Sequence, residues 1–428
     1  MKFRMSTMAA AIAAATMASS AGAVVVVGGD NGWEVSFDGN INLFYNYYDF
    51  ETTTTTSGGV STTLPDNGAN GTSSHLQEGL LPAFFSTNIK SPTVNGLTGT
   101  ARISFAPDSS SAKNTFNDKG GTAIDMREVV ANVAGSFGTV SFGRTLGLFG
   151  RQAILHDQTL FGVGDPLGVD NGGTTLGRIG IGYVYPEFRT RFAYATPSIN
   201  GFKAEVGLFD PQEPTAGSGF ETSVPKFEGE LSYATSFTNG NLLLWTGGMW
   251  QEMDDTVTSD SVTHWGVEVG GEVGYMGFAL TGYYYTGDAL GIGLKNAGTG
   301  RGVVAGAADF LSEGVNCGVI GGVAQCEEAE NDGFYVQGAY NFGQGTKVAL
   351  SYGESSQDGA TDSLGAAVFN DVTNEMWTVG VYHDLTSWLK LVAEYNNINK
   401  ESNSPIAGDQ TSTELEADAF SVGAFMTW

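Results

Sequence analysis

The arginines of this chain gather in one stretch, and arginine is the side chain best suited to binding anionic groups. After the first 23 residues the chain has eight arginines. Seven of these lie between residues 102 and 191: Arg102, Arg127, Arg144, Arg151, Arg178, Arg189 and Arg191. A guanidinium binds carboxylates through two parallel hydrogen bonds and stays charged at any physiological pH. The chemistry that this cluster suggests is electrostatic: either a patch of fixed positive charge or a set of ordinary salt bridges.

Bond-making chemistry finds little support in the residues. The four histidines are scattered and show no metal-ligand spacing: His75, His156, His264 and His383. Serine, histidine and aspartate all occur, but no nucleophile motif holds them together. We therefore expect no enzyme activity, no metal centre and no cofactor. A membrane-bound lipase or protease is the alternative.

Cys317 and Cys326 are the two cysteines, and nine positions separate them. In an oxidising compartment an even number of cysteines indicates a disulfide. Two free thiols or a metal site are the alternatives, but no histidine lies nearby in the sequence to complete a metal site. The sequence therefore predicts a bridge between Cys317 and Cys326.

The chain is strongly acidic, with a formal net charge of −27. Without Lys2 and Arg4 it has 17 basic residues against 46 acidic ones. This balance excludes nucleic acid as a partner, because phosphates need a basic surface. An acidic exterior suits divalent cations, so cations bound loosely at acidic loops are an alternative to no ligand.

The first 23 residues have the features of a secretory signal. Two positive charges open the chain, a small apolar run covers residues 8–17, and the small residues 21–23 form a cleavage site. The apolar run is too short to span a bilayer, which argues against a membrane anchor. We expect a cleaved signal peptide over 1–23 and an exported mature domain over 24–428.

The elements that must position the charged residues are β-strands. From Trp33 to Tyr47 the apolar residues share one face, while Asp38 and several asparagines share the other, which is the period of two of a strand. Sixteen segments read in this way: 33–49, 82–89, 97–105, 125–134, 139–144, 189–196, 202–210, 226–237, 241–252, 263–275, 278–286, 333–342, 346–354, 375–384, 388–397 and 414–428.

The connections between these segments alternate between short and long. Short ones such as 276–277 and 343–345 contain tight-turn residues, and long ones such as 145–188 and 287–332 follow at the other end. A mean hydropathy of −0.06 fits strands with one lipid face and one water face. We expect an all-β, 16-stranded antiparallel transmembrane β-barrel; a soluble β-sandwich is the alternative.

Particular segments resemble the general (non-specific) diffusion porins of Gram-negative bacterial outer membranes. Residues 126–144 read MREVVANVAGSFGTVSFGR, similar to that family's fourth and fifth strands and the glycine-rich turn between them. Residues 191–202 resemble the hairpin after its long third loop. The last strand ends on its apolar face at Trp428, which resembles the family's C-terminal assembly signal, although Phe is the usual residue there.

The resemblance implies a homotrimer of water-filled barrels with short periplasmic turns, long extracellular loops and a third loop, about 145–188, that folds inward. In the family, acids on that loop face arginines on the opposite wall. The corresponding acids here are Asp157, Asp165 and Asp170. Arg127 and Arg178 are assigned to the basic wall because their positions match the family pattern. Arg102 and Arg191 are assigned to it because they lie on inward-facing strand positions. Salt bridges near the loop bases are the alternative.

The predicted function is passive diffusion of small hydrophilic solutes and ions across the outer membrane. A substrate-selective channel of similar build, for example for sugars, is the first alternative, and an aromatic ladder of Tyr283, Tyr285 and Tyr335 along the pore would favour it. A non-conducting adhesin or structural barrel is the second. The expected partners are further copies of the chain, outer-membrane lipids and lipopolysaccharide, and the barrel-assembly machinery through the C-terminal strand.

Overall fold

The computed structural model describes most of the chain. The described residues are 24–28, 31–56, 60–63, 71–107, 109, 124–167, 174–211, 220–256, 258–292, 314–320, 322–362 and 364–428. The expected signal peptide lies outside these residues, so its cleavage stays a prediction.

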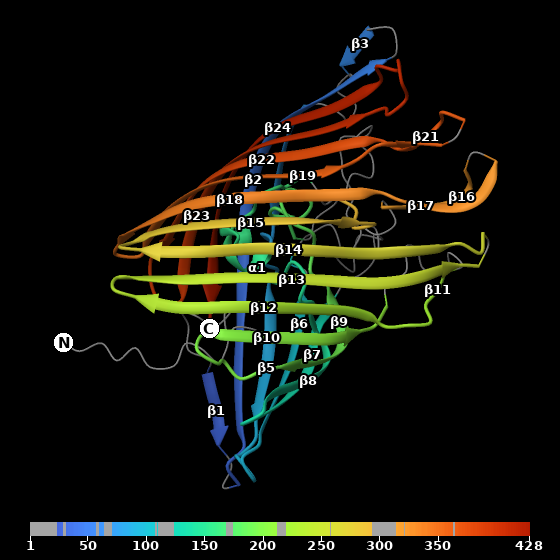
Figure 1. Cartoon of the computed structure of the whole chain (residues 1–428). Helices are drawn as coiled ribbons and strands as arrows, with labels where there is room; N and C mark the ends of the chain where they lie inside the picture. Colours follow the sequence, from blue (N-terminus) through green and yellow to red (C-terminus); the bar gives the residue numbers. More distant parts are fainter. Residues whose placement is uncertain are drawn as a thin grey trace.

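Sixteen antiparallel strands form a closed barrel, as the sequence predicted (Figure 1). The ring closes where the first long strand pairs with the last, from Asn40 opposite Thr427 to Thr55 opposite Ser412. The barrel strands are β2 (Glu34–Thr56), β5 (Phe84–Lys90), β6 (Thr98–Pro107), β7 (Ile124–Gly135), β8 (Gly138–Leu146), β9 (Phe188–Ala195), β10 (Phe202–Phe209), β12 (Lys226–Phe237), β13 (Gly240–Asp255), β14 (Ser261–Tyr275), β15 (Phe278–Asp288), β18 (Glu330–Gly343), β19 (Thr346–Gln357), β22 (Asp371–Asp384), β23 (Leu389–Asn403) and β24 (Ser412–Thr427).

Alternation along each strand separates an apolar exterior from a mixed interior. On β2, Ile41 and Tyr45 are exposed on the outside, whereas Asn42 and Asn46 are buried inside. On β24 the same alternation places Phe425 in the interior, against Phe44 and Phe161. A strand with two such faces suits a wall between lipid and a polar lumen.

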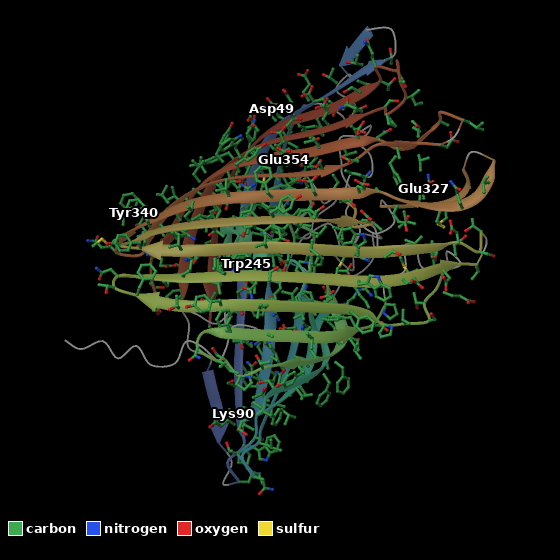
Figure 2. The ribbon with its side chains drawn as sticks, viewed as in Figure 1. Asp49, Lys90, Trp245, Glu327, Tyr340 and Glu354 are labelled. Carbon is green, nitrogen blue, oxygen red and sulfur yellow. A yellow bond between two sulfur atoms is a disulfide. The ribbon has the colours of Figure 1, made fainter. Side chains whose placement is uncertain are left out.

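The short turns gather at one end of the barrel and the long connections at the other (Figure 1). Four of the turns place two residues with positive φ at their tips: Asn95-Gly96, Asn200-Gly201, Met276-Gly277 and Gln344-Gly345. Positive φ at both central residues is the type I′ geometry that matches the twist of a hairpin. Figure 2 shows Tyr340 beside the short-turn end and Glu327 on a hairpin at the long-loop end.

The second strand of the wall is interrupted, which the sequence did not reveal. Its upper piece, β4 (Gly71–Gln77), pairs with β2 from Phe44 to Phe50, and β5 pairs with β2 lower down. Between the two pieces the Asn42 side-chain amide takes the place of the missing backbone hydrogen bonds to β2. It donates to Leu81 O at 2.8 Å and accepts from Gly79 N at 2.9 Å. The segment between the pieces turns Leu80 and Leu81 into the interior.

The remaining elements are short. β1 (Val24–Gly28) and β3 (Val60–Thr63) pair with β2, and β11 (Phe220–Glu221) pairs with β13. Two hairpins lie at the long-loop end: β16 (Val315–Ile320) with β17 (Val323–Glu328), and β20 (Ala360–Thr361) with β21 (Ala367–Phe369). The helices are α1 (Arg151–His156) and the 3₁₀ turn η3 (Gln158–Phe161). Within the described part of the chain, neither helix is long and apolar enough to cross a membrane.

Candidate functional site: the inward loop and its anchors

The connection between β8 and β9 spans residues 147–187, and its described residues, 147–167 and 174–187, lie inside the barrel. Figure 1 shows α1, which belongs to this connection, within the ring of strands. Its apolar residues pack against inward-facing wall residues in one cluster that includes Phe149, Ile154, Tyr283 and Tyr335. We call this connection the inward loop; it corresponds to the third loop expected at about 145–188.

Two wall carboxylates hold the beginning of the inward loop by its backbone. Glu228 on β12 accepts hydrogen bonds from Leu148 N at 2.6 Å and Phe149 N at 3.2 Å. Glu268 on β14 accepts from Gly150 N at 2.7 Å. Three consecutive backbone N–H groups thus have side-chain carboxyl oxygens of the wall as acceptors, so this part of the loop is fixed to the wall.

Arg151 at the start of α1 completes this attachment. Its guanidinium lies 3.1 Å from Glu205 and 3.0 Å from Glu230, and Gln152 Nε2 donates to Glu230 at 3.0 Å. Burial acts to lower the pKa of Arg151, but Glu230 and Glu205 outweigh it and raise that pKa. We name this group the first anchor. Its members are Arg151 on the loop and Glu205, Glu228, Glu230 and Glu268 on the wall.

A second anchor holds the middle of the loop on the opposite wall. Glu394 on β23 accepts from Val163 N at 2.8 Å and Gly164 N at 3.0 Å. Asp165 pairs with Lys400, also on β23, at 2.7 Å. The approach is so close that a Cβ atom on Gly162 would lie 1.7 Å from a Glu394 carboxylate oxygen. A larger residue at this point of the loop would therefore displace the Glu394 carboxylate.

A third anchor lies near the end of the loop, and Arg178 makes it with neutral acceptors. The fully buried guanidinium donates to Met376 O at 2.9 Å, Ser351 Oγ at 2.5 Å and Thr378 Oγ1 at 2.8 Å. Its nearest carboxylate, Asp157, belongs to the same loop and lies 3.8 Å away. Burial lowers the pKa of Arg178, and Asp157 acts in the opposite direction.

The wall arginines are neutralised by wall acids. Arg102 points inward and contacts Asp38 at 2.8 Å and Glu128 at 2.6 Å. Arg191 also points inward, pairs with Glu205 at 3.1 Å, and donates to Leu146 O at 3.1 Å. Both therefore lie in the interior, as their strand positions suggested, but their charge is balanced locally.

Three of the sequence assignments need correction. Arg178 was assigned to the wall, but it belongs to the loop and reaches outward. Asp157 does not face a wall arginine: it pairs with Arg178 and also accepts from Tyr183 Oη at 2.9 Å. Arg127 occupies the extra position of a bulge in β7, pairs with Asp125 at 2.8 Å, and lies over the Phe188 ring. The bulge changes its direction, which strand alternation does not reveal.

The expected arrangement of charge is therefore largely reversed. At the first anchor the loop supplies the cation and the wall supplies the acids. Asp165 alone, among the assigned acids within the described residues, pairs with a cation of the wall, and that cation is a lysine. Asp170 lies outside the described residues. Strand alternation in the sequence is enough to predict that Glu228, Glu268 and Glu394 face inward. Their role could not be predicted, because the groups that donate hydrogen bonds to them are backbone N–H groups of the inward loop, which is distant in the sequence.

Of three interior tyrosines, Tyr335 bonds the loop directly, and Tyr283 and Tyr285 bond residues of the wall. Tyr335 Oη donates to Ala153 O at 3.0 Å, Tyr283 Oη to Glu268 at 2.7 Å, and Tyr285 Oη to Ser355 Oγ at 2.9 Å. All three are buried under the loop. They do not form an aromatic ladder along an open path, which removes the feature that would favour a sugar channel.

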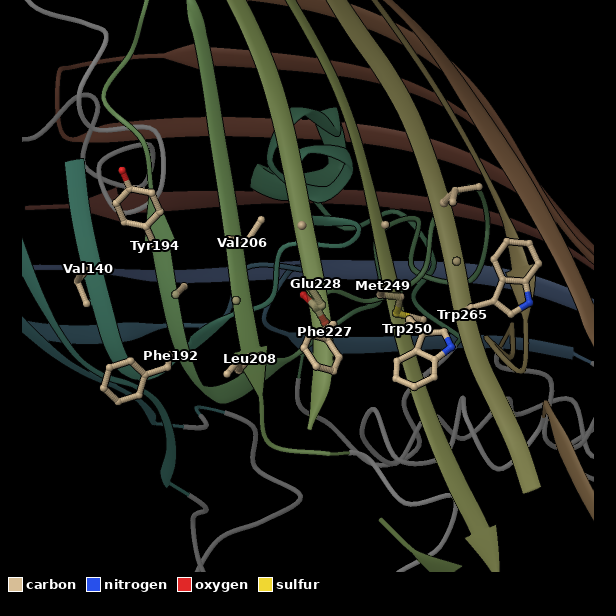
Figure 3. A pocket seen from close by; sticks show the side chains of 16 residues that line it. Val140, Phe192, Tyr194, Val206, Leu208, Phe227, Glu228, Met249, Trp250 and Trp265 are labelled. Atoms are coloured by element: carbon tan, nitrogen blue, oxygen red, sulfur yellow. The ribbon is translucent and has the colours of Figure 1, made fainter. Parts of the chain in front are cut away.

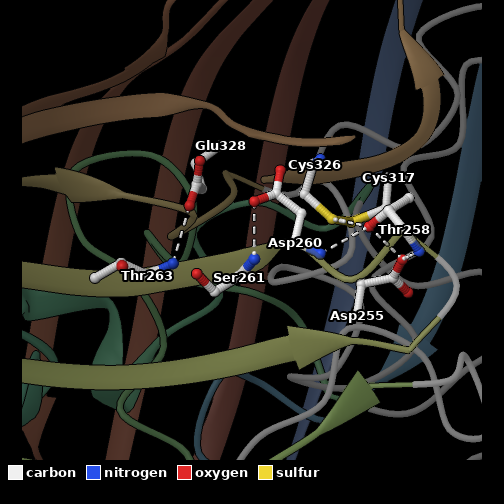
Figure 4. The surroundings of a disulfide bond; sticks show 8 residues. All are labelled: Asp255, Thr258, Asp260, Ser261, Thr263, Cys317, Cys326 and Glu328. Carbon is white, nitrogen blue, oxygen red and sulfur yellow. Dashed lines mark hydrogen bonds between the residues drawn. A yellow bond between two sulfur atoms is a disulfide. The ribbon is translucent and has the colours of Figure 1, made fainter. Parts of the chain in front are cut away.

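Cys317 and Cys326 are joined by a disulfide across the β16–β17 hairpin (Figure 4). Cys326 N donates to Asp260 Oδ2 at 2.9 Å, which ties the hairpin to the β13–β14 connection. Asp255 lies close to both sulfurs, but the sulfurs are bonded to one another and are not metal ligands. The bridge lies in a hairpin at the long-loop end and not in a strand of the barrel wall.

Trp428 closes the chain against β2. Its backbone exchanges hydrogen bonds with Gly39, at 3.1 and 3.3 Å. A Cβ atom on Gly39 would lie 2.5 Å from the Trp428 ring, so the ring packs against a glycine. Met426 and Phe420 precede it on the exposed face, as the alternation predicted.

Comparisons with known proteins agree with this architecture. The family model described as Gram-negative porin matches residues 6–403. The outer membrane channel DcaP of Acinetobacter baumannii is 13% identical, with a TM-score of 0.61 over 95% of this chain and 100% of that one. The anion-selective porin from Comamonas acidovorans is 13% identical, with a TM-score of 0.57 over 92% and 100%.

A third solved structure, Salmonella typhi OmpF in complex with daunomycin, is 11% identical, with a TM-score of 0.51 over 95% of this chain and 100% of that one. The comparison with curated proteins gave no match. Identities this low show a shared fold and nothing finer.

Proposed function

The chain belongs to the Gram-negative porin family and forms an outer-membrane channel for passive diffusion, and we propose that this channel is of the general kind. Small hydrophilic solutes and ions would pass according to size and charge, without a dedicated binding site. No bond is made or broken in this function, so we propose no enzyme activity and no cofactor.

The observation that carries the proposal is the attachment of the inward loop. The three anchors fix the loop to the wall at its beginning, middle and end, with carboxylates, a lysine and neutral acceptors as partners. A loop held at separate points forms a rigid constriction, and the groups that line a constriction set the flux. Size limitation follows from a fixed cross-section.

Two other functions fit the same fold. A sugar-selective channel would expose aromatic faces along its path, whereas the interior tyrosines here are covered by the loop. A non-conducting adhesin or structural barrel would need no anchored constriction. The loop anchors therefore favour diffusion over both.

Single-channel recording of the purified protein in a planar bilayer tests the proposal. We expect discrete conductance steps that scale with KCl concentration and are not blocked by millimolar oligosaccharide. Saturable block by a sugar would indicate the selective channel, and a silent bilayer with correctly folded protein would indicate the structural barrel. Either result would overturn general diffusion.

We further propose that three copies associate in the membrane, in contact with lipopolysaccharide and other outer-membrane lipids. Ala131 and Gly135 on β7 are small residues, which close packing of barrel walls requires. The C-terminal strand ending at Trp428 would present the signal for the barrel-assembly machinery, and acidic loops would bind divalent cations loosely. A mass of one chain for the detergent-solubilised protein would reject the trimer.

The orientation has its own test. Cysteine at Ser259 should react with an impermeant maleimide on intact cells, because long connections face outward in the proposed topology. Cysteine at Asn239, in a short turn, should not react. The reverse pattern would invert the barrel.

A further inference from the structure

β13 carries the chain from the lipid-facing wall to the long-loop end of the barrel. Trp250 lies on the apolar outer face of this strand (Figure 3), and its cross-strand partner on β14 is Trp265. Aromatic side chains of this kind mark the boundary between hydrocarbon and head groups. The strand continues beyond Trp250 and ends at Asp255. Asp255 therefore lies past the apolar wall, on the side of the aqueous medium.

The disulfide hairpin packs against the connection between β13 and β14 (Figure 4). Thr258 Oγ1 lies 3.6 Å from Cys326 Sγ, and Thr263 N donates to Glu328 Oε1 at 2.9 Å. Together with the hydrogen bond from Cys326 N to Asp260, these contacts hold β17 beside the connection. Two segments that are distant in the sequence therefore meet around the two sulfurs.

Three possible metal-binding atoms converge at this point. The two sulfurs of Cys317 and Cys326 and a carboxylate oxygen of Asp255 all lie within 4.8 Å of one another. The cysteines face each other across β16 and β17, with their Cα atoms 4.1 Å apart. In the part of the chain that the structure describes, no other three His, Cys, Asp or Glu side chains converge so closely. The donor set is two sulfurs and one oxygen.

This group of side chains is largely sheltered from water. Asp255 is 3% exposed and Cys326 is 8% exposed, and apolar residues of β13 and β14 pack around Cys326. The Asp255 carboxylate accepts from Thr258 N and Thr258 Oγ1, both at 2.6 Å. Outer hydrogen bonds of this kind orient the ligands of metal ions. Cys317 is only half-buried, so a small molecule can reach the bridge.

The charges around the sulfurs suit a cation. Figure 4 draws the acids Asp255, Asp260 and Glu328 beside the bridge, and none of the side chains drawn is basic. A surface with one sign of charge raises the local concentration of ions of the opposite sign. Acids alone would not select a particular metal. Thiolates do, because they prefer Zn²⁺ and other soft or borderline ions to Mg²⁺ and Ca²⁺.

The disulfide form cannot use these sulfurs, because each is bonded to the other. A dithiol reductant changes this. Its two thiol groups give up two electrons and two protons and close into a cyclic disulfide, while the S–S bond of the protein breaks and Cys317 and Cys326 become thiols. On binding a metal ion, each thiol releases its proton to water. Two thiolates and one carboxylate then occupy three positions of a tetrahedral ion, and water occupies the fourth.

We propose that reduction of the disulfide turns Cys317, Cys326 and Asp255 into a metal site of the zinc type. The hairpin is then closed by a covalent bond under oxidising conditions and by a metal ion under reducing ones. The ion also joins β17 to the end of β13, because its ligands come from both strands. The inference concerns the long-loop end of the barrel and does not depend on whether the barrel conducts.

Metal binding by the oxidised and the reduced protein tests the proposal without any substitution. The folded barrel in detergent is reduced with dithiothreitol, separated from it by gel filtration without oxygen, and dialysed against Cd²⁺, which resembles Zn²⁺. An excess of Mg²⁺ occupies other acids. We expect one Cd²⁺ per chain in the reduced protein, with the ultraviolet absorption of a cadmium–thiolate bond, and none in the oxidised protein. Equal binding in the two forms, including none in either, would overturn the proposal, and so would bound Cd²⁺ without thiolate absorption.

Asp255→Asn tests the oxygen ligand, and Glu328→Gln is its matched control. Both remove one negative charge beside the bridge, but the Glu328 carboxylate accepts from Thr263 N and is not among the converging atoms. We expect the affinity of the reduced protein for Cd²⁺ to fall by about 10–100-fold in Asp255→Asn, the range for losing a group that supports a metal site. In Glu328→Gln it should change little.

Both variants must form the disulfide when oxidised and keep the heat-modifiable gel mobility of a folded barrel before their affinities are compared. A loss confined to Asp255→Asn supports the proposed ligand set. Equal losses in the two variants would overturn it, because charge alone would then attract the ion.

Discussion

The first and third anchors hold the same loop with opposite chemistry. At the first, Arg151 pairs with Glu205 and Glu230, so the charge of the loop is met by charge on the wall. At the third, Arg178 brings its own carboxylate, Asp157, and the wall offers only carbonyl and hydroxyl oxygens. Losing Arg151 leaves Glu230 on the wall without a cation and leaves Glu205 with Arg191 alone. Losing Arg178 leaves Asp157 of the loop without a cation. The two arginines are equally buried but should not be equally important.

Substituting Arg151 should have the largest effect on the loop. Arg151→Ala leaves the buried Glu230 without its cation and leaves Glu205 with Arg191 alone, which costs about 3–5 kcal/mol. The barrel keeps its strand hydrogen bonds, so the cost falls on the loop. We expect frequent conductance fluctuations or a larger open step in planar bilayers.

Arg102→Ala is the matched control for that substitution. It removes the same charge from a buried pair that joins two parts of the wall and does not touch the loop. We expect a lower thermal unfolding temperature with steady single-channel current. Fluctuations of equal size in both variants would show that the first anchor does not hold the loop.

Substituting Arg178 should have a smaller effect. In Arg178→Met the Ser351 and Thr378 hydroxyls can turn to other partners, and Asp157 keeps its hydrogen bonds from Thr159 and Tyr183. The expected cost is about 1–3 kcal/mol, that of hydrogen bonds lost at a buried site. Fluctuations weaker than those of Arg151→Ala support the difference between the anchors, and stronger ones reverse it.

The second anchor offers a steric test that changes no charge. In Gly162→Ala the new methyl group meets the Glu394 carboxylate, which must move and release Val163 N or Gly164 N. We expect a cost of about 1–2 kcal/mol, one charge-assisted hydrogen bond, detected as faster proteolysis of the loop. Gly338→Ala, on the open outer surface, should leave proteolysis unchanged.

The sequence predicted the wall far better than the site. All sixteen strands could be read because a period of two repeats over many residues, and the faces of β2 and β24 follow from it directly. The interruption between β4 and β5 could not be read, since Asn42 replaces the ladder with side-chain bonds that leave no periodic signal.

The loop could be located by its length, but its contacts depend on three-dimensional proximity. The position of Arg178 in the sequence resembles that of the family's wall arginine. Whether the residue lies on the wall or reaches the wall from the loop depends on a turn that contains Gly177 and Gly180, both at positive φ. Residue type and spacing therefore indicated that charge would gather here. They did not indicate which side would supply which sign.

Ion selectivity should show the smallest effect, because charge is balanced at each anchor. Arg151 and Lys400 are paired with acids at close range, and charges beyond about 8–10 Å are screened at physiological salt. The excess of acids elsewhere then enriches cations at the mouths. We expect weak cation selectivity, measured as a reversal potential in a KCl gradient, that fades as salt rises.

Asp165→Asn leaves Lys400 without its carboxylate and should shift the potential toward anions. Asp384→Asn removes the same charge from a more exposed pair with Lys390 and should shift it less. A clear anion preference in the unmodified protein would mean that the arginines outweigh the acids at the constriction.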